Sequence, residues 1–557
     1  MQSLDEELFR DFEYVSFDVY DTLVTRPYVR PTDLFMHVER LTGKEGFAAA
    51  RIEAERSARR VHRREITLDE IYDILGGGYG ECRKKELELE TSVPVPVKDR
   101  MELLEKLKGN GKKIVLVSDM YLPHDTVSKM LEHVGVRYDY LYVSSEFGFS
   151  KHNGKLYGHI LKDLRIGPSD IVHVGDNRHS DCDMPRSIGI KSILCGKPID
   201  SYRKKHGKEY KFYSKKKSLD RSMIVAADML SDADASWHGL GYRFGGPLAV
   251  SYAIFVNGDG LALYASRDGY NLKRIGEELY PDRKTEYVCA QRLLLDVLTE
   301  DALPYGRAVP EKSTYGRNKQ KAAIGRILRF YGIGTSGDVV STYNSTVERL
   351  DKLRKEGLES YRAYLKEKCG DGEVHLIDCT TMKFSSQRLI EYVLGRPIAG
   401  HYLVALGDSD MEHYAMCRWR RPMIGWTNVN IPEFFLCSPE YPLCGWNGGP
   451  VYDTEDENDR FRVSVYGEVS DGELDYAKHY KKLFGKNIIS FDYASVVEWS
   501  RISAARGCGY RGLLKKIRWA SNPDHSDYSN LIVGIGDAGA VIKRLAVGAL
   551  DRVFGKE

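Results

Sequence analysis

The feature that most constrains the fold is the stretch at residues 15–24, VSFDVYDTLV. Its first residues are apolar or β-prone and run into Asp18, and the turn-prone pair Asp21 and Thr22 follows. This pattern predicts a buried strand that ends in a carboxylate. Ligands of open α/β sheets bind at the carboxyl ends of the strands, so Asp18 is placed for chemistry. A surface aspartate in a turn would explain Asp18 alone equally well.

Three later segments favour the functional interpretation. A second predicted strand, at residues 113–118, ends in Ser118, and Asp119 follows at once. Lys151 stands ahead of a helical run, after a Phe-Gly-Phe turn. A third predicted strand ends in Asp176, with Asp181 five residues further on. Because the carboxyl ends of parallel strands meet at one edge of a sheet, these side chains are expected to form one site.

In this order the four motifs resemble those of the haloacid dehalogenase superfamily, over about the first 200 residues. The resemblance implies an α/β domain of the Rossmannoid type in which Asp18 is the nucleophile and carries a phosphoryl group as an aspartyl-phosphate. Mg²⁺ would neutralise the repulsion between the Asp18 carboxylate and the phosphate group that it attacks. Its ligands would be Asp18, Asp176, the backbone carbonyl of Tyr20, and Asp181 or a water.

The same resemblance gives roles to the remaining polar residues of the motifs. Ser118 is expected to donate a hydrogen bond to a phosphoryl oxygen, and Lys151 to hold the nucleophile and offset charge in the transition state. Thr22 and Asp119 are expected to contact the substrate. Arg26, close behind the nucleophile, is the arginine singled out to meet an anionic substrate.

One position departs from the phosphatases of this superfamily. They usually carry a second aspartate two positions after the nucleophile, as general acid for the leaving oxygen, and here that position is Tyr20. Dehalogenases also have a non-acidic residue there. The next carboxylate is Asp21, which would serve as the acid through a shifted turn. The rest of the chain favours phosphatase over dehalogenase activity.

Length and composition indicate two large domains. The chain has 557 residues, 42% of them hydrophobic, and a formal net charge of +2, which gives no general attraction to nucleic acid. The ten cysteines include no Cys-x-x-Cys pair, and the first residues lack the pattern of a signal peptide. No apolar run is long enough to span a bilayer. We therefore expect a cytoplasmic protein with at most peripheral membrane contact, possible at the inner face of the membrane.

Changes in composition suggest the domain limits. Residues 1–200 are expected to form the dehalogenase-like domain, with a helical cap at about 30–108. Residues 201–222 are rich in Lys, Arg and Tyr and are interpreted as a basic linker, with contact to anionic lipid or a lipid-linked acceptor as the alternative. Residues 223–557 are expected to form the second domain.

The second half contains three more predicted strands that run into charged or hydroxyl residues. The first, at 261–265, precedes Arg267 and Asp268; the second, at 286–292, ends in Arg292; the third, at 374–381, carries Asp378. The last strand and the helix after it add Thr380, Thr381, Lys383 and Gln387. Such clusters at strand ends predict a site for a phosphate-rich ligand with a metal. Mutual pairing of Arg267, Asp268 and Asp378 is the structural alternative.

Segments 16–23, 118–122, 266–270 and 376–381 together look like those of dual-domain bacterial ribofuranosyltransferases. In that family a dehalogenase-fold phosphatase is fused to a glycan phosphoribosyltransferase with a divergent α/β glycosyltransferase fold. The resemblance implies transfer from phosphoribosyl diphosphate to a lipid-linked glycan acceptor of a surface polysaccharide, followed by removal of the 5-phosphate. The phosphate ligands would be Arg267, Arg292 and Lys383.

The same resemblance implies roles for the other candidate residues of the second half. Asp268 or Asp378 would bind the metal or act as base, and Thr380 and Thr381 would donate to the 5-phosphate, with Gln387 also contacting substrate. Two alternatives stay open. One keeps the phosphatase and makes the second half a non-catalytic glycan-binding module. The other is a scaffold with an inactive hydrolase domain, for which Tyr20 is the argument.

Overall fold

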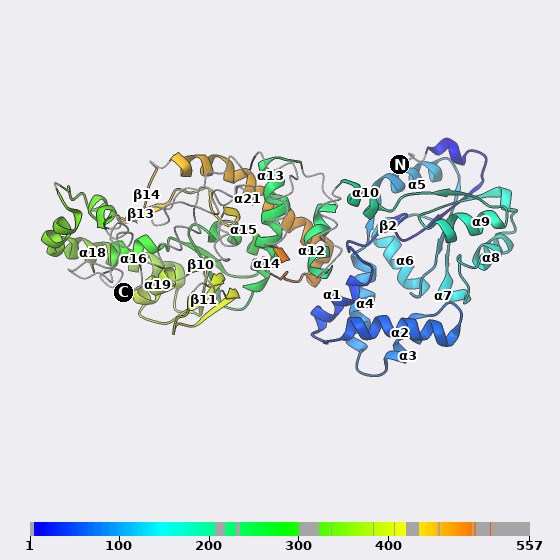
Figure 1. Ribbon diagram of the computed structural model, residues 1–557, viewed down its shortest axis with the longest axis horizontal. Helices are drawn as coiled ribbons and strands as arrows, with labels where there is room; N and C mark the ends of the chain where they lie inside the picture. The colour runs from blue at the N-terminus through cyan, green and yellow to red at the C-terminus, as the bar shows by residue number, and fades with distance from the viewer. Residues whose placement is uncertain are drawn as a thin grey trace, which may run out of the picture. The chain divides into compact units, whose positions relative to one another are not determined.

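The chain forms two compact units in the computed structural model. The first is Met1–Ser231 together with Tyr480–Ile489, and the second is Asp232–His479 together with Ser490–Glu557. The described residues are 5–205, 218–229, 234–299, 321, 324–335, 337–381, 384–405, 407–418, 434–454, 457–492, 495–496 and 513. Each unit contains a parallel five-stranded sheet (Figure 1), which confirms the predicted α/β fold class.

The sheet of the first unit has the strand order β5-β4-β1-β6-β7, and every neighbouring pair is parallel. Its strands are β1 Tyr14–Asp18, β4 Lys113–Ser118, β5 Tyr140–Val143, β6 Ile171–Gly175 and β7 Lys191–Leu194. Asp18 lies opposite Val117 in the register, so β1 and β4 end at the same edge. The apolar residues of the central strand β1, Val15 and Phe17, are fully buried, as expected for a parallel sheet covered on both faces.

Helices cover this sheet on both sides of its central strands. They are α5 Lys98–Gly109, α6 His124–His133, α7 Ser144–Phe147, α8 Lys155–Leu164 and α9 Met184–Ser187. Leu156 and Ile160 of α8 pack in one buried cluster with Val115 and Val117 of β4. The short turns in this unit are η1 Glu6–Phe9, η2 Pro168–Asp170 and the π-helical η3 Arg178–Asp183.

Four helices inserted between β1 and β4 form a cap, seen in blue on one side of this unit in Figure 1. They are α1 Asp33–Thr42, α2 Phe47–His62, α3 Leu68–Leu75 and α4 Gly80–Ser92. The insertion leaves the core at β2, Val24–Thr25, and returns at β3, Val95–Pro96, which pair in antiparallel register. Helix α5 falls within the predicted cap limits of 30–108 but packs against β4 of the sheet.

The cap helices are held together by a buried ion pair. Arg51 of α2 lies 2.7 Å from Glu86 of α4, and both side chains are fully buried. The hydroxyl of Tyr72 on α3 donates to the same carboxylate at 2.7 Å. The guanidinium also lies 4.5 Å from the ring of Phe35 and 4.8 Å from that of Tyr121. Because removing one partner would leave an unpaired buried charge, this contact fixes how three helices pack.

The first unit also contains segments from beyond residue 200. Helix α10, Pro198–Lys205, ends inside the stretch predicted as a linker, and α12, Ser218–Met229, packs against α1. Ser222 of α12 accepts a hydrogen bond from the backbone N–H of Val29 at 2.8 Å and donates to Asp33 at 2.6 Å. Part of the predicted linker is therefore folded onto the cap.

The distal segment, Tyr480–Ile489, completes the cap although it lies about 400 residues further along the chain. Asn487 in the short turn η5, Gly485–Asn487, is almost fully buried. Its side-chain oxygen accepts from Lys85 at 3.0 Å, its amide nitrogen donates to Glu88 at 3.0 Å, and its backbone carbonyl accepts from His37 at 2.8 Å. The hydrogen bonds of Asn487 thus connect α1 with α4.

The second unit has a sheet of order β12-β11-β10-β8-β9, again parallel throughout. Its strands are β8 Leu261–Ala265, β9 Thr285–Val288, β10 Val374–Thr381, β11 Ala399–Ala405 and β12 His413–Arg418. The strand predicted at 286–292 is shorter than expected, because β9 ends at Val288 and Gln291 stands at the N-cap of a helix that begins with Arg292.

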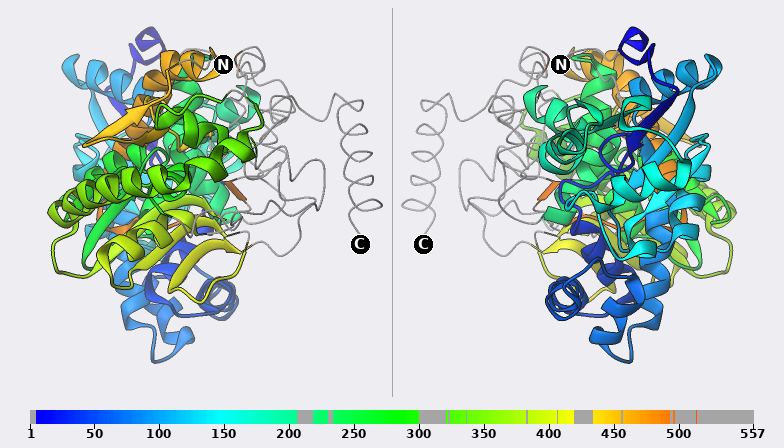
Figure 2. Two further views of the ribbon diagram at one scale, coloured as in Figure 1. Left: turned by 90° about the vertical axis from the view of Figure 1, so that its left-hand side faces the viewer. Right: turned by 90° about the vertical axis from the view of Figure 1, so that its right-hand side faces the viewer.

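Helices surround this second sheet, and a small hairpin lies beside them. They are α13 Trp237–Leu240, η4 Gly241–Gly245, α14 Gly246–Phe255, α15 Gly269–Leu279, α16 Arg292–Leu298, α18 Val339–Cys369, α19 Ser385–Leu394 and α21 Glu457–Phe484, with the hairpin β13 Leu443–Trp446 and β14 Pro450–Tyr452. The long helix α18, green in the left view of Figure 2, packs against α16, α19 and β9.

A buried carboxyl group lies within the packing of the second unit. Glu473 of α21 is fully buried and accepts a hydrogen bond from the side-chain amide of Asn271 on α15. Burial raises the pKa of Glu473 well above its usual value, and Arg274 opposes this only in part. A Cβ at Gly245 would lie 2.0 Å from its Oε1 atom, so the glycine leaves room for the carboxyl group.

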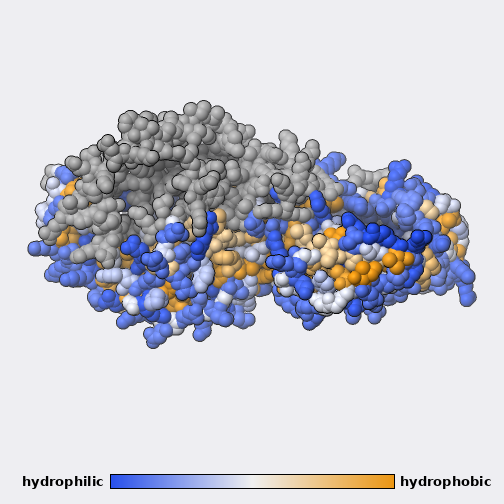
Figure 3. Space-filling view, turned by 60° about the horizontal axis from the view of Figure 1, so that its bottom comes forward, coloured by the Kyte–Doolittle hydropathy of each residue, from blue (hydrophilic) through white to orange (hydrophobic). Residues whose placement is uncertain are grey.

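Hydrophilic residues occupy much of the face in Figure 3, with hydrophobic areas between them. Among the described helices, none combines the length and the apolar character that crossing a bilayer requires.

The contacts of Asn487 predict a measurable role in stability. Asn487→Ala removes the hydrogen bonds to Lys85 and Glu88, and we expect the free energy of unfolding to fall by about 1–2 kcal/mol. Urea unfolding of the full chain measures this change. Asn110→Ala, at an exposed helix end, is the matched control and should leave the stability unchanged. Equal effects of the two substitutions would contradict the role of Asn487.

Glu473 predicts a dependence of stability on pH. Its folded pKa is raised, so its contribution to stability is present below the unfolded pKa of about 4.5 and is lost as the pH rises. Glu473→Gln removes this loss. The melting temperatures of parent and variant should be similar near pH 4.5 and separate as the pH rises to 8, with the variant higher. Glu468→Gln, exposed on the same helix, should show no such separation.

Candidate active site

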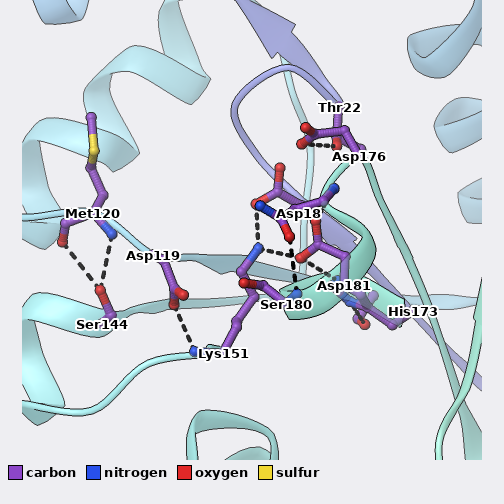
Figure 4. Close-up of polar contacts among 12 residues, drawn as sticks. Asp18, Thr22, Asp119, Met120, Ser144, Lys151, His173, Asp176, Ser180 and Asp181 are labelled. Carbon is purple, nitrogen blue, oxygen red and sulfur yellow. Dashed lines mark hydrogen bonds and ion pairs between the residues drawn. The ribbon is translucent and has the colours of Figure 1, made fainter. Parts of the chain in front are cut away.

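Three carboxylates gather at the carboxyl edge of the first sheet. Asp18 ends β1, Asp176 directly follows β6, and Asp181 lies in η3. One carboxylate oxygen from each lies within 4.8 Å of the others, and Figure 4 shows the three side chains turned toward one another. Carboxylate oxygens at this spacing are suitable ligands for Mg²⁺. We call Asp18, Asp176 and Asp181 the carboxylate cluster.

Lys151 is the cation inside this cluster. Its Nζ atom contacts Oδ1 of Asp18 and lies 2.7 Å from Oδ1 of Asp181. Burial alone would lower the pKa of Lys151, but the two carboxylates hold it well above its usual value. Burial raises the pKa of Asp18 to about 8, with Lys151 opposing the rise. Burial also disfavours the Asp181 carboxylate, but Lys151 and His173 together outweigh it, and the pKa of Asp181 is lowered.

Asp119 contacts the loop of this lysine, and Ser118 directly precedes Asp119 in the chain. The Asp119 carboxylate accepts from the backbone N–H groups of Lys151 at 2.8 Å and of His152 at 3.3 Å. It therefore fixes the loop that carries Lys151, a role that the predicted substrate contact did not include. Ser118 is buried at the end of β4. Met120, which follows Asp119, donates its backbone N–H to Ser144 at 2.9 Å, and this bond holds the loop against α7 (Figure 4).

A buried network behind the carboxylate cluster was not predicted. Ser16 of β1 lies 2.6 Å from Nδ1 of His173 on β6, and Nε2 of His173 lies 3.4 Å from Oδ1 of Asp181. If Ser16 donates to Nδ1, the ring carries its proton on Nε2 and donates to Asp181. Burial lowers the pKa of His173, which is consistent with a neutral ring. The backbone N–H of Asn177 also donates to Asp181, at 2.9 Å.

The residues after Asp18 also lie near the carboxylate cluster. Asp21 has a left-handed backbone, with φ of 59°, and its Oδ1 accepts from the hydroxyl of Thr25 at 3.0 Å. The hydroxyl of Thr22 donates to Asp176 at 3.4 Å, so Thr22 contacts a member of the cluster. Lys197, which follows β7, lies 2.7 Å from Asp176 and 3.7 Å from Asp21. Lys197 was missed, although a lysine just beyond a strand end was the available signal.

Tyr20 and Arg26 pack together beside the cap. The guanidinium carbon of Arg26 lies 4.4 Å from the centre of the Tyr20 ring, and Nε donates to Glu90 of α4 at 2.9 Å. Burial, reinforced by Glu90, raises the pKa of the Tyr20 phenol, so this side chain is protonated at neutral pH. Arg26 was predicted to meet the substrate; its described ion pair is with the cap.

In the second unit, three predicted residues lie near one sheet edge. Arg267 and Asp268 follow β8, and Asp378 lies on the adjacent strand β10. Burial raises the pKa of Asp268 to about 6, against the attraction of Arg267 and Arg462. Burial and then the charge of Asp268 raise the pKa of Asp378 to about 7. The two carboxyl groups are therefore close enough to influence each other.

Two residues near this edge were missed by sequence reasoning. Asp459 of α21 accepts from Arg267 at 3.3 Å and from Arg462 at 2.8 Å. Arg462 also donates to the backbone carbonyls of Ser438 and Glu440. Their sequence context, a charged helix, gave no sign of a site. Arg267 thus pairs with Asp459, a carboxylate that the structural alternative did not include.

The other predicted residues of this unit have different positions. Gln387 is fully buried; it donates to the carbonyls of Ile398 and Glu412, each at 2.9 Å, and accepts from Tyr402 at 3.0 Å. Thr381 accepts from the backbone N–H of Phe384 at 2.8 Å. Thr380 lies 3.5 Å from the sulfur of Cys379. Arg292 is the first residue of α16, and Lys383 lies outside the described residues.

The position of Asp119 predicts an effect on catalysis through the Lys151 loop. Asp119→Ala removes both acceptors from that loop, and we expect the turnover number for a phosphate monoester to fall on the order of tenfold to a hundredfold. Steady-state kinetics with p-nitrophenyl phosphate measure this. Asp73→Ala, on an exposed cap position, should retain the parent rate. A parent-like rate for Asp119→Ala would refute the positioning role.

Part of the first unit matches a known protein family. Residues 12–189 match the family of haloacid dehalogenase-like hydrolases. Among solved structures, the L-2-haloacid dehalogenase PA0810 is 16% identical, with 34% of this chain and 86% of that chain covered and a TM-score of 0.28. A predicted phosphoglycolate phosphatase from Haemophilus somnus 129PT is 17% identical, with 33% and 85% covered and a TM-score of 0.26.

An L-2-haloacid dehalogenase from Xanthobacter autotrophicus, with chloropropionic acid covalently bound, is 14% identical, with 33% of this chain and 77% of that chain covered and a TM-score of 0.26. The match to the family model ends before the second unit begins. The chain therefore carries an N-terminal haloacid dehalogenase-like hydrolase domain and, after it, a second α/β domain with a parallel sheet of its own.

Proposed function

We propose that the first domain hydrolyses a phosphate monoester through an aspartyl-phosphate on Asp18. The observation that carries this proposal is a buried carboxylate at a strand end with Lys151 against it and two further carboxylates within 4.8 Å. A carboxylate and a phosphate repel each other, so the site must supply positive charge. Phosphoryl transfer needs such a set, because positioning and charge stabilisation do most of the work.

The carboxylate cluster fits a divalent cation by the hardness and spacing of its donors. Asp18, Asp176 and the backbone carbonyl of Tyr20 would hold Mg²⁺, with Asp181 as a further ligand directly or through water. When bound, Mg²⁺ neutralises the charge between nucleophile and phosphoryl group and polarises a phosphoryl oxygen.

The chain's own residues then carry the reaction. An oxygen of Asp18 attacks phosphorus as the ester oxygen leaves, and water later hydrolyses the aspartyl-phosphate to free phosphate. Lys151 holds Asp18 in place, and Ser118 donates to a phosphoryl oxygen. Asp21 is our candidate for protonating the leaving oxygen. Because its Oδ1 accepts from Thr25, that step requires the Asp21 side chain to turn away from Thr25.

For the whole chain we propose a two-step ribofuranosyl transfer. In the second domain an acceptor hydroxyl of a glycan attacks C1 of phosphoribosyl diphosphate, the C1–O bond breaks, and diphosphate leaves. The proposal is supported by the resemblance of the four segments and by the proximity of Arg267, Asp268 and Asp378 at one sheet edge. Either Asp268 or Asp378, both of which have a raised pKa, would accept the proton of the acceptor hydroxyl, and Arg267 would bind phosphate.

The first domain would then remove the 5-phosphate and leave a neutral ribofuranose on the glycan. Fusion of the two activities raises the effective concentration of the phosphorylated intermediate at the phosphatase site of the first domain. The acceptor we propose is a lipid-linked glycan of a surface polysaccharide at the inner face of the cytoplasmic membrane. No nucleic-acid partner is proposed, since the formal net charge is only +2.

Incubation with phosphoribosyl diphosphate and a synthetic glycan distinguishes this proposal from its alternatives. Release of diphosphate and free phosphate together supports the two-step reaction. Free phosphate alone, from a phosphorylated glycan, supports a phosphatase with a glycan-binding second domain. If neither diphosphate nor phosphate is released, the result supports a scaffold.

Two substitutions test which domain performs which step. Asp18→Asn removes the nucleophile and should leave a phosphoribosylated glycan, detected by mass spectrometry as a product heavier by one phosphate. Asp378→Asn should stop diphosphate release while phosphatase activity toward p-nitrophenyl phosphate is kept. Asp371→Asn, exposed ahead of β10, is the control for the second variant and should retain both steps. Unphosphorylated ribose in the product of Asp18→Asn would refute this division of labour.

A further inference from the structure

Lys197 occupies a position that the motifs of the first domain do not account for. It lies between β7 and α10, and its Nζ atom is 2.7 Å from Oδ2 of Asp176 and 3.7 Å from Oδ2 of Asp21. The Asp176 side chain is only 7% exposed, whereas that of Lys197 is 40% exposed. The ammonium group therefore approaches the cluster from the solvent side.

The two lysines at this site are held very differently. Lys151 is 3% exposed and contacts two carboxylates of the cluster, so it cannot leave without exposing buried charge. Lys197 contacts one member of the cluster and can exchange that contact for water. Because the Lys197 side chain is 40% exposed, its ammonium group remains accessible to water, so this exchange costs less than one at Lys151 would.

Asp176 is also one of the three proposed ligands of the divalent cation. Mg²⁺ binds its oxygen ligands at about 2.0–2.1 Å, and a second positive charge on the same carboxylate repels it. The ammonium group at 2.7 Å and a cation on Asp176 therefore compete for one carboxylate.

We propose that Lys197 is an internal counter-ion that pairs with Asp176 in the metal-free protein and is displaced from it when a divalent cation binds. The inference rests on the proposed metal dependence of the first domain. It makes Lys197 a residue that weakens metal binding and stabilises the empty site. Since Lys197 also lies near Asp21, its displacement links occupancy by metal to the surroundings of the candidate general acid.

Direct binding of Mn²⁺, followed by the electron paramagnetic resonance signal of the free ion, tests this without measuring activity. Lys197→Met should bind Mn²⁺ about fivefold more tightly than the parent, which corresponds to the loss of one competing surface ion pair. Lys197→Arg keeps the charge and should bind no more tightly than the parent. Lys204→Met, exposed at the end of α10, is the matched control and should bind as the parent does.

Ionic strength separates a contact from a general change of charge. At high salt the influence of distant charges is screened, and the tighter binding by Lys197→Met should persist because the contact is short. Melting temperature gives a second readout: without metal, Lys197→Met should melt below the parent, and Mn²⁺ should raise its melting temperature by more.

The outcomes distinguish this inference from the proposed function. Equal Mn²⁺ affinity of the parent and Lys197→Met overturns the role of Lys197 and leaves the metal site intact. The absence of saturable binding by either protein overturns the metal site and the counter-ion with it. An equal gain in affinity by Lys204→Met would show a general charge effect and would also overturn the inference.

Discussion

The first domain depends on the attraction between one buried lysine and the carboxylates around it. Lys151 reaches the cluster from a loop, and its contacts with Asp18 and Asp181 bring together residues from β1, from η3 and from that loop. Without the ammonium group these largely buried carboxylates would repel one another with little solvent to screen their charges. Asp119, which accepts from the loop, and His173, which contacts Asp181, help to keep this attraction in a fixed geometry.

The sequence allowed this half to be predicted well because its signals are local. Each strand is a short apolar run, and Asp18, Ser118 and Asp176 stand at or directly after strand ends, where a parallel sheet brings them to one edge. His173 and Lys197 could not be assigned in this way. His173 is an ordinary strand residue until Ser16 on a neighbouring strand is known to face it, and Lys197 acquires a partner only through the fold.

The second half shows the limit of the same reasoning. Asp268 and Asp378 were predicted from strand ends, and they lie close enough for the charge of Asp268 to raise the pKa of Asp378. Gln387 fitted the same pattern, yet its amide joins α19 to the backbone around β11. The long helix α21 supplies Asp459 and Arg462 from far along the chain, and no local pattern marks such a contribution. Strand ends thus indicate where a site lies, but not which distant helix completes it.

The ten residues Tyr480–Ile489 have a consequence for how this protein can be taken apart. A hydrolase domain made only from the start of the chain would lack Asn487, and the groups on α1 and α4 that it joins would be left to water. The compact unit is therefore discontinuous along the chain. A truncation after residue 231 would omit a part of the cap, so a hydrolase domain prepared for study needs this distant segment as well.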